Sequence, residues 1–234
     1  TGATAAIFYS LSIDNYFTST ASISINTGQN NSSAPTGLAS ITKSLGGLGG
    51  ILSSENKTKF IYLEILHSRK FLNEFIKKEN IMPVIFKDIW DSKNHTWSVP
   101  EHELPTVWSA YNQFVAENFD VEDDSVTGIV RISVTAPDSA LASSWVMKII
   151  SSANEIIKQE KREEINNNIL YLSEQITTSK AQGIRNSASS LLLIEMQKQM
   201  LNKNSDIFKV IDPAFDSQIK QGPQRSLIVI ALTI

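Results

Sequence analysis

The three histidines are the side chains best suited to metal binding or proton transfer, and they are widely separated in the chain. His67, His95 and His102 lie in different predicted elements, without the short spacing that places metal ligands on one helix face or turn. His102-Glu103 begins like the His-Glu-x-x-His motif of zinc proteases, but no second histidine follows and Pro105 interrupts the helix that the motif needs. We therefore expect no metal and no cofactor.

Other patterns that suggest chemistry also lack parts that the chemistry requires. Residues 45–50 (LGGLGG) are glycine-rich, but no Lys-Ser or Lys-Thr follows to bind phosphate, and the spacing does not fit the dinucleotide fingerprint. Residues 122–124 (EDD) lack the alternating ligands and central glycine of a calcium loop, and we interpret them as a solvated turn before a strand. No Gly-x-Ser-x-Gly elbow is present, and the chain has no cysteine for thiol catalysis or disulfides. The sequence therefore predicts a protein that is not an enzyme.

Composition places the 234-residue chain among ordinary globular sequences. Hydrophobic residues make up 41% and charged residues 19%, and the formal net charge is −3. Nucleic-acid binding requires a basic excess, which is absent, so we expect no nucleic-acid partner. The length allows one large or two small domains.

The longest predicted element lies between residues 137 and 204. Its first part carries apolar residues at steps of three or four within two groups: Trp145, Ile149, Ala153 and Ile156, then Ile165, Ile169, Leu172 and Ile176. Asp138 or Ser139 can cap the first turn, and no glycine or proline follows until Gly183. One helix of about 45 residues, roughly 65 Å long, is therefore expected. A globular domain of this size has a radius of gyration of about 17–18 Å, so such a helix must project from it.

A second helix is expected to return along the first. Gly183 can turn the chain, after which helical spacing resumes at Ala188, Leu191, Leu192, Ile194, Glu195, Met196 and Met200. A long helix with one apolar stripe needs a partner along its length, supplied by a returning helix or a neighbouring subunit. The segment therefore predicts a helical hairpin with a mechanical or assembly role.

The rest of the chain predicts an α+β base. Strand patterns occur at the start, middle and end of the chain, in residues 15–26, 126–135 and 207–212. Helical patterns lie between them, in residues 56–80, with a break near His67, and 104–118. Strands in three separate parts of the chain, with helices between them, indicate an α+β base from which the hairpin emerges.

Both ends of the chain are apolar. Residues 3–11 and 227–234 are each too short to span a bilayer, which needs about 20 residues. Either could be a terminal strand or helix packed on the core. Together, with Arg225 just before the second segment, they favour two transmembrane helices of which only the inner ends are present.

Several stretches, in this order, resemble one family. Residues 11–23 (LSIDNYFTSTASI) follow an apolar segment, residues 62–76 (YLEILHSRKFLNEFI) follow the glycine-rich loop, and residues 208–225 (FKVIDPAFDSQIKQGPQR) lead into the closing apolar segment. Residues 126–146 and 191–201 fall at the matching places between them. The chain thus resembles a Wzz-type polysaccharide co-polymerase over nearly its whole length. It departs at Asp216-Ser217, where the family commonly has a proline.

The resemblance implies a domain organisation and a function. It implies a first transmembrane helix ending in residues 1–11, a periplasmic base with a mixed sheet from residues 12–136 and 205–224, a hairpin from 137–204, and a second transmembrane helix starting in 225–234. It further implies a homo-oligomeric ring in the bacterial inner membrane, with most of the chain in the periplasm. Such a ring sets the modal chain length of an O-antigen-type polysaccharide. Its partners would be a separate Wzy-type membrane polymerase and the growing lipid-linked polysaccharide.

Candidate functional residues lie on the hairpin and near its return to the membrane. The mixed-charge stretch 158–164 is either a solvated helix face or a subunit or glycan contact. The oligomer-interface candidates are Lys158, Lys161, Arg162, Ile169, Leu172 and Ile176. Pro213, Pro223 and Arg225 form the predicted membrane-proximal turn.

Two other functions stay open. Related co-polymerases for capsule and exopolysaccharide carry a cytoplasmic tyrosine-kinase domain after the second membrane helix, a region beyond residue 234. A periplasmic secretion adaptor also has a helical hairpin, but it would be expected to carry lipoyl-like β segments and usually one membrane anchor.

Overall fold

A computed structural model describes residues 15–26, 55–202, 206–217 and 220–222. The predicted transmembrane segments, 1–11 and 225–234, and the glycine-rich residues 45–50 lie outside the described residues. Among the helices that are described, none combines the length and the apolar content needed to cross a membrane.

The described elements are both helical and extended. The helices are α3 (Glu55–His67), α4 (Arg69–Lys78), α5 (Met82–Ile85), α6 (Val107–Gln113), α7 (Ser139–Thr178) and α8 (Gln182–Asn202). The strands are β1 (Phe17–Ile25), β2 (Trp90–Asp91), β3 (Thr96–Trp97), β4 (Phe119–Asp124), β5 (Ile129–Ala136) and β6 (Phe208–Asp212). The predicted α+β class, with a sheet and long helices, is confirmed.

The chain divides into two compact units. The first comprises Thr1–Ser24, Leu66–Ser151 and Val210–Ile234, and the second comprises Ile25–Ile65 and Ser152–Lys209. Each unit is described by itself below. The boundaries predicted for base and hairpin stay predictions.

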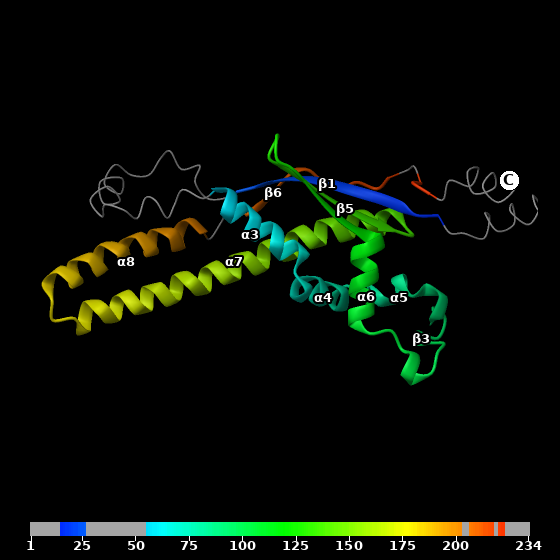
Figure 1. Cartoon of the computed structure of the whole chain (residues 1–234), viewed down its shortest axis with the longest axis horizontal. Helices are drawn as coiled ribbons and strands as arrows, with labels where there is room; N and C mark the ends of the chain where they lie inside the picture. The colour runs from blue at the N-terminus through cyan, green and yellow to red at the C-terminus, as the bar shows by residue number, and fades with distance from the viewer. Residues whose placement is uncertain (1–14, 27–54, 203–205, 218–219, 223–234) are drawn as a thin grey trace, which may run out of the picture. The chain divides into compact units, whose positions relative to one another are not determined.

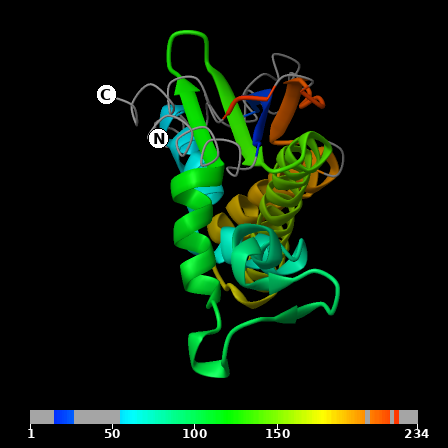
Figure 2. The ribbon, with the colours of Figure 1, turned by 90° about the vertical axis from the view of Figure 1, so that its right-hand side faces the viewer.

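The main sheet has four strands in the order β4-β5-β1-β6. Strand β5 runs antiparallel to both neighbours, with Ile132 opposite Ala21 of β1 and Val121 of β4 (Figure 2). The resemblance implied a mixed sheet, and the pairs β1–β5 and β4–β5 are both antiparallel, so a mixed sheet stays a prediction. Strands β4 and β5 are joined by a tight turn, in which Gly128 has a φ of +73°, and such a turn can connect only antiparallel neighbours.

Alternation along β1 and β5 separates a core face from a polar face. Ala21 and Ile23 on β1 and four residues of β5, Val130, Ile132, Val134 and Ala136, are all at most 1% exposed. The other face carries hydroxyl pairs across the two strands, Thr18 with Thr135 and Thr20 with Ser133, each 2.8 Å apart. This period of two, readable in the sequence, places the core on one side of the sheet.

Aromatic rings fill the core of the first unit. Phe114 follows α6 in a π-helical turn, Phe114–Asn118, and is fully buried. Its ring centroid lies 5.8 Å from that of Phe119, 6.1 Å from that of Trp145 and 6.4 Å from that of Phe75. One ring therefore joins α4, α7 and β4 into a single apolar cluster.

Polar caps fix the starts of three helices. Ser68 separates α3 from α4, at the predicted break, and accepts a hydrogen bond from Phe71 N at 3.2 Å. Thr106 and Ser109 form a capping box on α6. Asp138 Oδ1 accepts from Leu141 N at 2.9 Å at the start of α7, as predicted. These local bonds occupy amides that have no partner within the helix.

Two local predictions are wrong. The acidic residues 122–124, predicted to be a turn, lie in the edge strand β4, where Glu122 is 3.6 Å from Arg131 of β5. Charged side chains suit an exposed sheet edge because they oppose pairing with a further strand. Gly183, predicted to be the hairpin turn, lies within α8, and the chain instead turns at residues 179–181.

Candidate functional surface of the hairpin

The second unit contains a helical hairpin. Helix α7 is 40 residues long, and its part from residue 152 onward runs beside α8 in the opposite direction (Figure 1). Near the turn, Arg185 Nη1 donates to Ser179 O at 2.8 Å. Farther along, Gln199 Nε2 donates to Asn166 Oδ1 at 2.8 Å. These bonds fix the register of the two helices.

The seam between the helices is shallow. Ile165 on α7 and Ala188 on α8 are buried, at 8% and 4% exposure. The predicted interface residues Ile169, Leu172 and Ile176 follow Ile165 at steps of four, three and four, and all three are half-buried. The structure thus places these three candidates on the face of α7 that includes Ile165.

A carboxylate occupies part of the corresponding face of α8. Glu195 is seven residues after Ala188, two helical turns along the same face, and its side chain is 12% exposed. Glu195 pairs with Lys198 at 2.7 Å. Gln199 lies on the same side of α8, towards α7. Two helices that are stable as a pair carry apolar side chains at such facing positions, whereas here two of these positions are polar.

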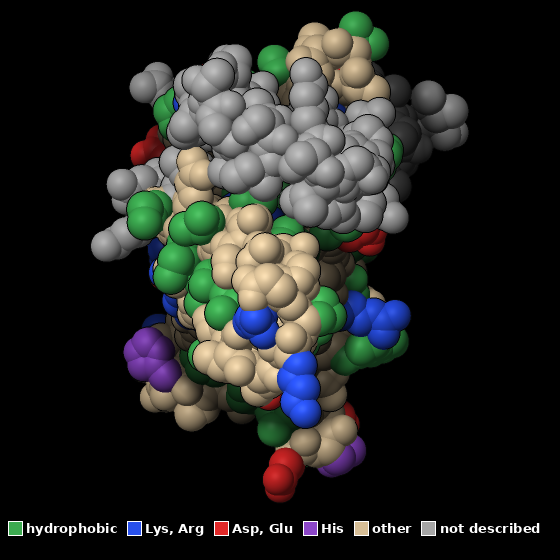
Figure 3. Space-filling model, turned by 90° about the vertical axis from the view of Figure 1, so that its left-hand side faces the viewer, with side chains coloured by type: hydrophobic (Ala, Val, Ile, Leu, Met, Phe, Trp, Pro, Cys, Tyr) green, Lys and Arg blue, Asp and Glu red, His purple; other side chains and the backbone are tan. Residues whose placement is uncertain are grey.

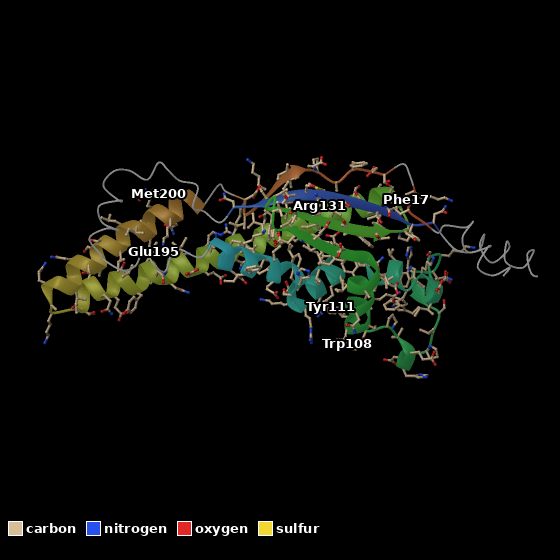
Figure 4. All side chains as sticks on the ribbon, turned by 45° about the horizontal axis from the view of Figure 1, so that its top comes forward. Phe17, Trp108, Tyr111, Arg131, Glu195 and Met200 are labelled. Atoms are coloured by element: carbon tan, nitrogen blue, oxygen red, sulfur yellow. The ribbon has the colours of Figure 1, made fainter. Side chains whose placement is uncertain are left out.

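Apolar side chains of α8 instead face outward. Leu193, Met196 and Met200 are 62%, 42% and 76% exposed. Their spacing of three and four residues places them on one side of α8, here called the outer stripe (Figure 4 labels Met200 and Glu195). On α7, Leu170 and Tyr171 are also exposed, at 69% and 61%. Figure 3 shows hydrophobic side chains among polar ones at this end of the molecule.

The three basic candidates differ in their surroundings. Lys158 Nζ lies 2.5 Å from Asp206 Oδ1, and Lys161 Nζ lies 5.2 Å from the centre of the Tyr62 ring. Both contacts are made within the second unit. Arg162 is exposed. Of the three, Arg162 is thus the one whose side chain points to solvent.

The membrane-proximal turn is described only in part. Pro213 is exposed and directly follows β6, whereas Pro223 and Arg225 lie outside the described residues. Close by in the chain, Tyr16 N donates to Gly222 O at 3.1 Å, and Gln221 N donates to Tyr16 O at 3.0 Å. These bonds bring together the two points from which the apolar end segments depart.

The histidines of the described chain lie in separate local environments. In the ranges that the structure describes, no group of three or more His, Asp or Glu is placed to hold a metal. His67 packs edge-on against the Phe119 ring, and His95 lies in the β2–β3 turn with a φ of 52°. In that turn the Asn94 side chain and the Lys93 and Asn94 amides donate to Asp91, which lowers the pKa of its carboxyl below the ordinary value.

Sequence reasoning missed the outer stripe as a separate surface. Leu193 belongs to the continuous apolar run 191–194, and Met196 and Met200 follow it at helical spacing, so periodicity alone did not divide α8 into an inner and an outer side. The signal that divides them is Glu195 and Gln199, polar residues at inward positions.

No protein-family model matches the chain, and no curated protein matches it. Among solved structures, the chain is similar to a fragment of WzzB, a polysaccharide co-polymerase from Salmonella Typhimurium, with 12% identity and a TM-score of 0.43 over 89% of this chain and 100% of that one. It is also similar to a full-length bacterial polysaccharide co-polymerase, with 10% identity and a TM-score of 0.34 over 99% of this chain and 85% of that one. Both structures belong to the class of protein that the sequence motifs resemble.

Proposed function

We propose that this protein regulates the modal chain length of an O-antigen-type surface polysaccharide and acts as an oligomeric scaffold rather than as an enzyme. The observation that carries the proposal is the hairpin, whose outer stripe exposes Leu193, Met196 and Met200 while Glu195 lies half-buried. We propose an O-antigen-type polysaccharide as the polymer because the order of motifs along the chain resembles that of Wzz-type co-polymerases.

Assembly follows from how apolar surface is distributed on the hairpin. Exposed large apolar side chains in a row are unfavourable in water, and burying them between two copies releases about 25 cal/mol per Å². The outer stripe of α8 and the pair Leu170 and Tyr171 on α7 lie on different helices. Two different patches that meet between neighbouring copies give a head-to-tail contact, which closes into a ring when the rotation allows it.

The remaining parts of the proposal concern location and partners. The chain ends are proposed to continue as inner-membrane helices, with the described residues in the periplasm. A separate polymerase would elongate the lipid-linked polysaccharide, and the ring would determine how long polymerase and product stay together.

The test is the size distribution of the surface polysaccharide in a strain that lacks the gene and in the same strain with the gene restored. We expect loss of the modal cluster of band lengths on deletion and its return on restoration. Total loss of polymer on deletion would contradict the proposal, because it indicates polymerisation or export. An unchanged distribution would contradict length control altogether.

Two variant genes, each returned to the deletion strain, test whether length control depends on the outer stripe. Met196→Asp places a charge within the stripe, whereas Ser187→Asp places the same charge on an exposed residue two and a half turns away, on the opposite side of α8. We expect Ser187→Asp to restore the modal cluster and Met196→Asp to give a broad distribution. A modal cluster in both strains would show that the stripe has no part in length control.

A further inference from the structure

Three polar side chains are buried in the described part of the chain, and all three bind the same stretch. Ser19, Ser143 and Asn154 are 3%, 9% and 7% exposed. Each forms a hydrogen bond with a residue between Ile207 and Asp216, the stretch that follows the hairpin. Because a buried polar group is costly unless it is hydrogen-bonded, their common target calls for an explanation.

Asn154 holds the beginning of this stretch within the second unit. Its Oδ1 accepts from Ile207 N at 3.0 Å and from Phe208 N at 2.8 Å, and its Nδ2 donates to Phe208 O at 3.0 Å. One side chain thus binds three backbone groups of two successive residues. A shift of the stretch by one residue would break this set, since successive residues of a strand face opposite sides.

Two serines hold the end of the stretch within the first unit. Ser19 Oγ donates to Phe215 O at 2.7 Å. The hydroxyl of Ser143 donates to the carboxylate of Asp216, and it also lies 3.0 Å from Ala140 O. Asp216 belongs to the one place where the motif departs from the family pattern, and here it supplies the acceptor for Ser143.

Apolar burial fixes only the beginning of the same stretch. Ile207 and Phe208 are 2% and 1% exposed, but Ile211 and Phe215 are 54% and 67% exposed. The register of a strand is well specified when one face of it is buried, and it is weakly specified otherwise. Beyond Phe208, the polar contacts are therefore what distinguishes one register from another.

Two of the three side chains belong to one helix. Ser143 and Asn154 are both in α7 and are 11 residues apart, about three turns, so they lie on the same face. We propose that Asn154, Ser143 and Ser19 are positioning residues that set the register of residues 207–216.

The test uses the absence of cysteine from the chain. A single cysteine is introduced at Val210, which is half-buried, or at the exposed Ile211, and its rate of thiol labelling is measured. In the parent chain we expect Ile211→Cys to react about tenfold faster than Val210→Cys. In an Asn154→Leu background, which keeps the side-chain volume, we expect the two rates to become similar, because the stretch is then no longer held in one register and each position is exposed in part of the population.

Two controls separate a register change from unfolding. Ala136→Cys, 1% exposed in β5, should stay unlabelled in every background. Asn154→Asp keeps an acceptor for the Ile207 and Phe208 amides and loses only the donor to Phe208 O, so its ratio should stay closer to the parent's than that of Asn154→Leu. A parent-like ratio in Asn154→Leu, with Ala136→Cys protected, would overturn the proposal.

If Ala136→Cys is labelled in the Asn154→Leu background, the fold has been lost and a second variant is used. The double variant Ser19→Ala/Ser143→Ala is then compared at Ala214, which is half-buried, and Phe215, which is exposed. Convergence of the labelling rates of Ala214→Cys and Phe215→Cys supports the proposal, and an unchanged ratio overturns it.

Discussion

The two units bury apolar side chains to very different extents. In the first unit, Phe75, Phe114 and Trp145 are at most 2% exposed, and their rings contact one another through Phe114. In the hairpin of the second unit, Leu170, Leu193 and Met200 are each more than 60% exposed. The first unit completes its own core, whereas the hairpin leaves much of its apolar surface without cover from the described part of the chain.

This difference shows how to separate stability from assembly. Substitutions in the ring cluster should lower the free energy of unfolding of a single copy. Substitutions on the outer stripe should leave a single copy intact and weaken contacts between copies. The predictions below are ordered by the size of the effect on one copy.

The largest effect is expected for Phe114→Ala. Removing a fully buried ring that touches three others leaves a cavity and should lower the free energy of unfolding by about 3–5 kcal/mol. Urea unfolding followed by circular dichroism measures the change. Trp108→Ala is the matched control, because Trp108 is 65% exposed (Figure 4) and should change stability by less than about 0.5 kcal/mol. Equal losses in both variants would contradict the contrast between core and surface.

An intermediate effect is expected for Ile169→Asp. Ile169 is half-buried on the same face of α7 as Ile165, so a carboxylate there should cost about 1–3 kcal/mol through loss of apolar contact and partial burial of charge. It should also weaken oligomers and broaden the polysaccharide length distribution. Urea unfolding, sedimentation of the assembly and a polysaccharide gel measure the three effects. Unchanged stability, oligomers and length distribution would show that this face of α7 contributes neither to the stability of one copy nor to assembly.

The smallest effect is expected in the β2–β3 turn at acid pH. The pKa of Asp91 is lowered in the folded chain, chiefly by the hydrogen bond from the Asn94 side chain. The stability that the ionised carboxylate contributes is therefore present above pH 3.8 and is lost as pH falls through the lower folded pKa. The protection factors for amide exchange at Lys93 and Asn94 should fall over that range, and Asp91→Asn should remove this pH dependence of protection. The same dependence in Asp91→Asn would exclude this carboxylate as its source.

The sequence predicted those features of the fold that depend on local spacing. The core face of β5 follows from strict alternation between Ile129 and Ala136, and the start of α7 follows from Asp138 before an apolar period. The break between α3 and α4 follows from Ser68 and its cap.

The remainder depends on contacts between distant residues, and the sequence did not predict it. The acidic strand β4 pairs with β5 across the sheet, which outweighs the low strand propensity of aspartate. Asn154 binds Phe208 of β6 across 54 residues, and no local pattern distinguishes it from a solvated helical asparagine. The division of α8 into a seam and an outer stripe becomes visible only when α7 lies beside it.

The central claim is that the outer stripe joins copies of this chain, and the most direct test is the mass of the assembly. The whole chain in mild detergent is examined by analytical ultracentrifugation beside Leu193→Asp/Met196→Asp and the matched control Ser187→Asp. We predict that the parent and the control form assemblies several times the 25.9 kDa of one copy, and that the double variant sediments as one copy with an unchanged circular dichroism spectrum. A double variant that keeps the parent's assembly mass, or a parent that sediments as a single copy, would contradict the claim.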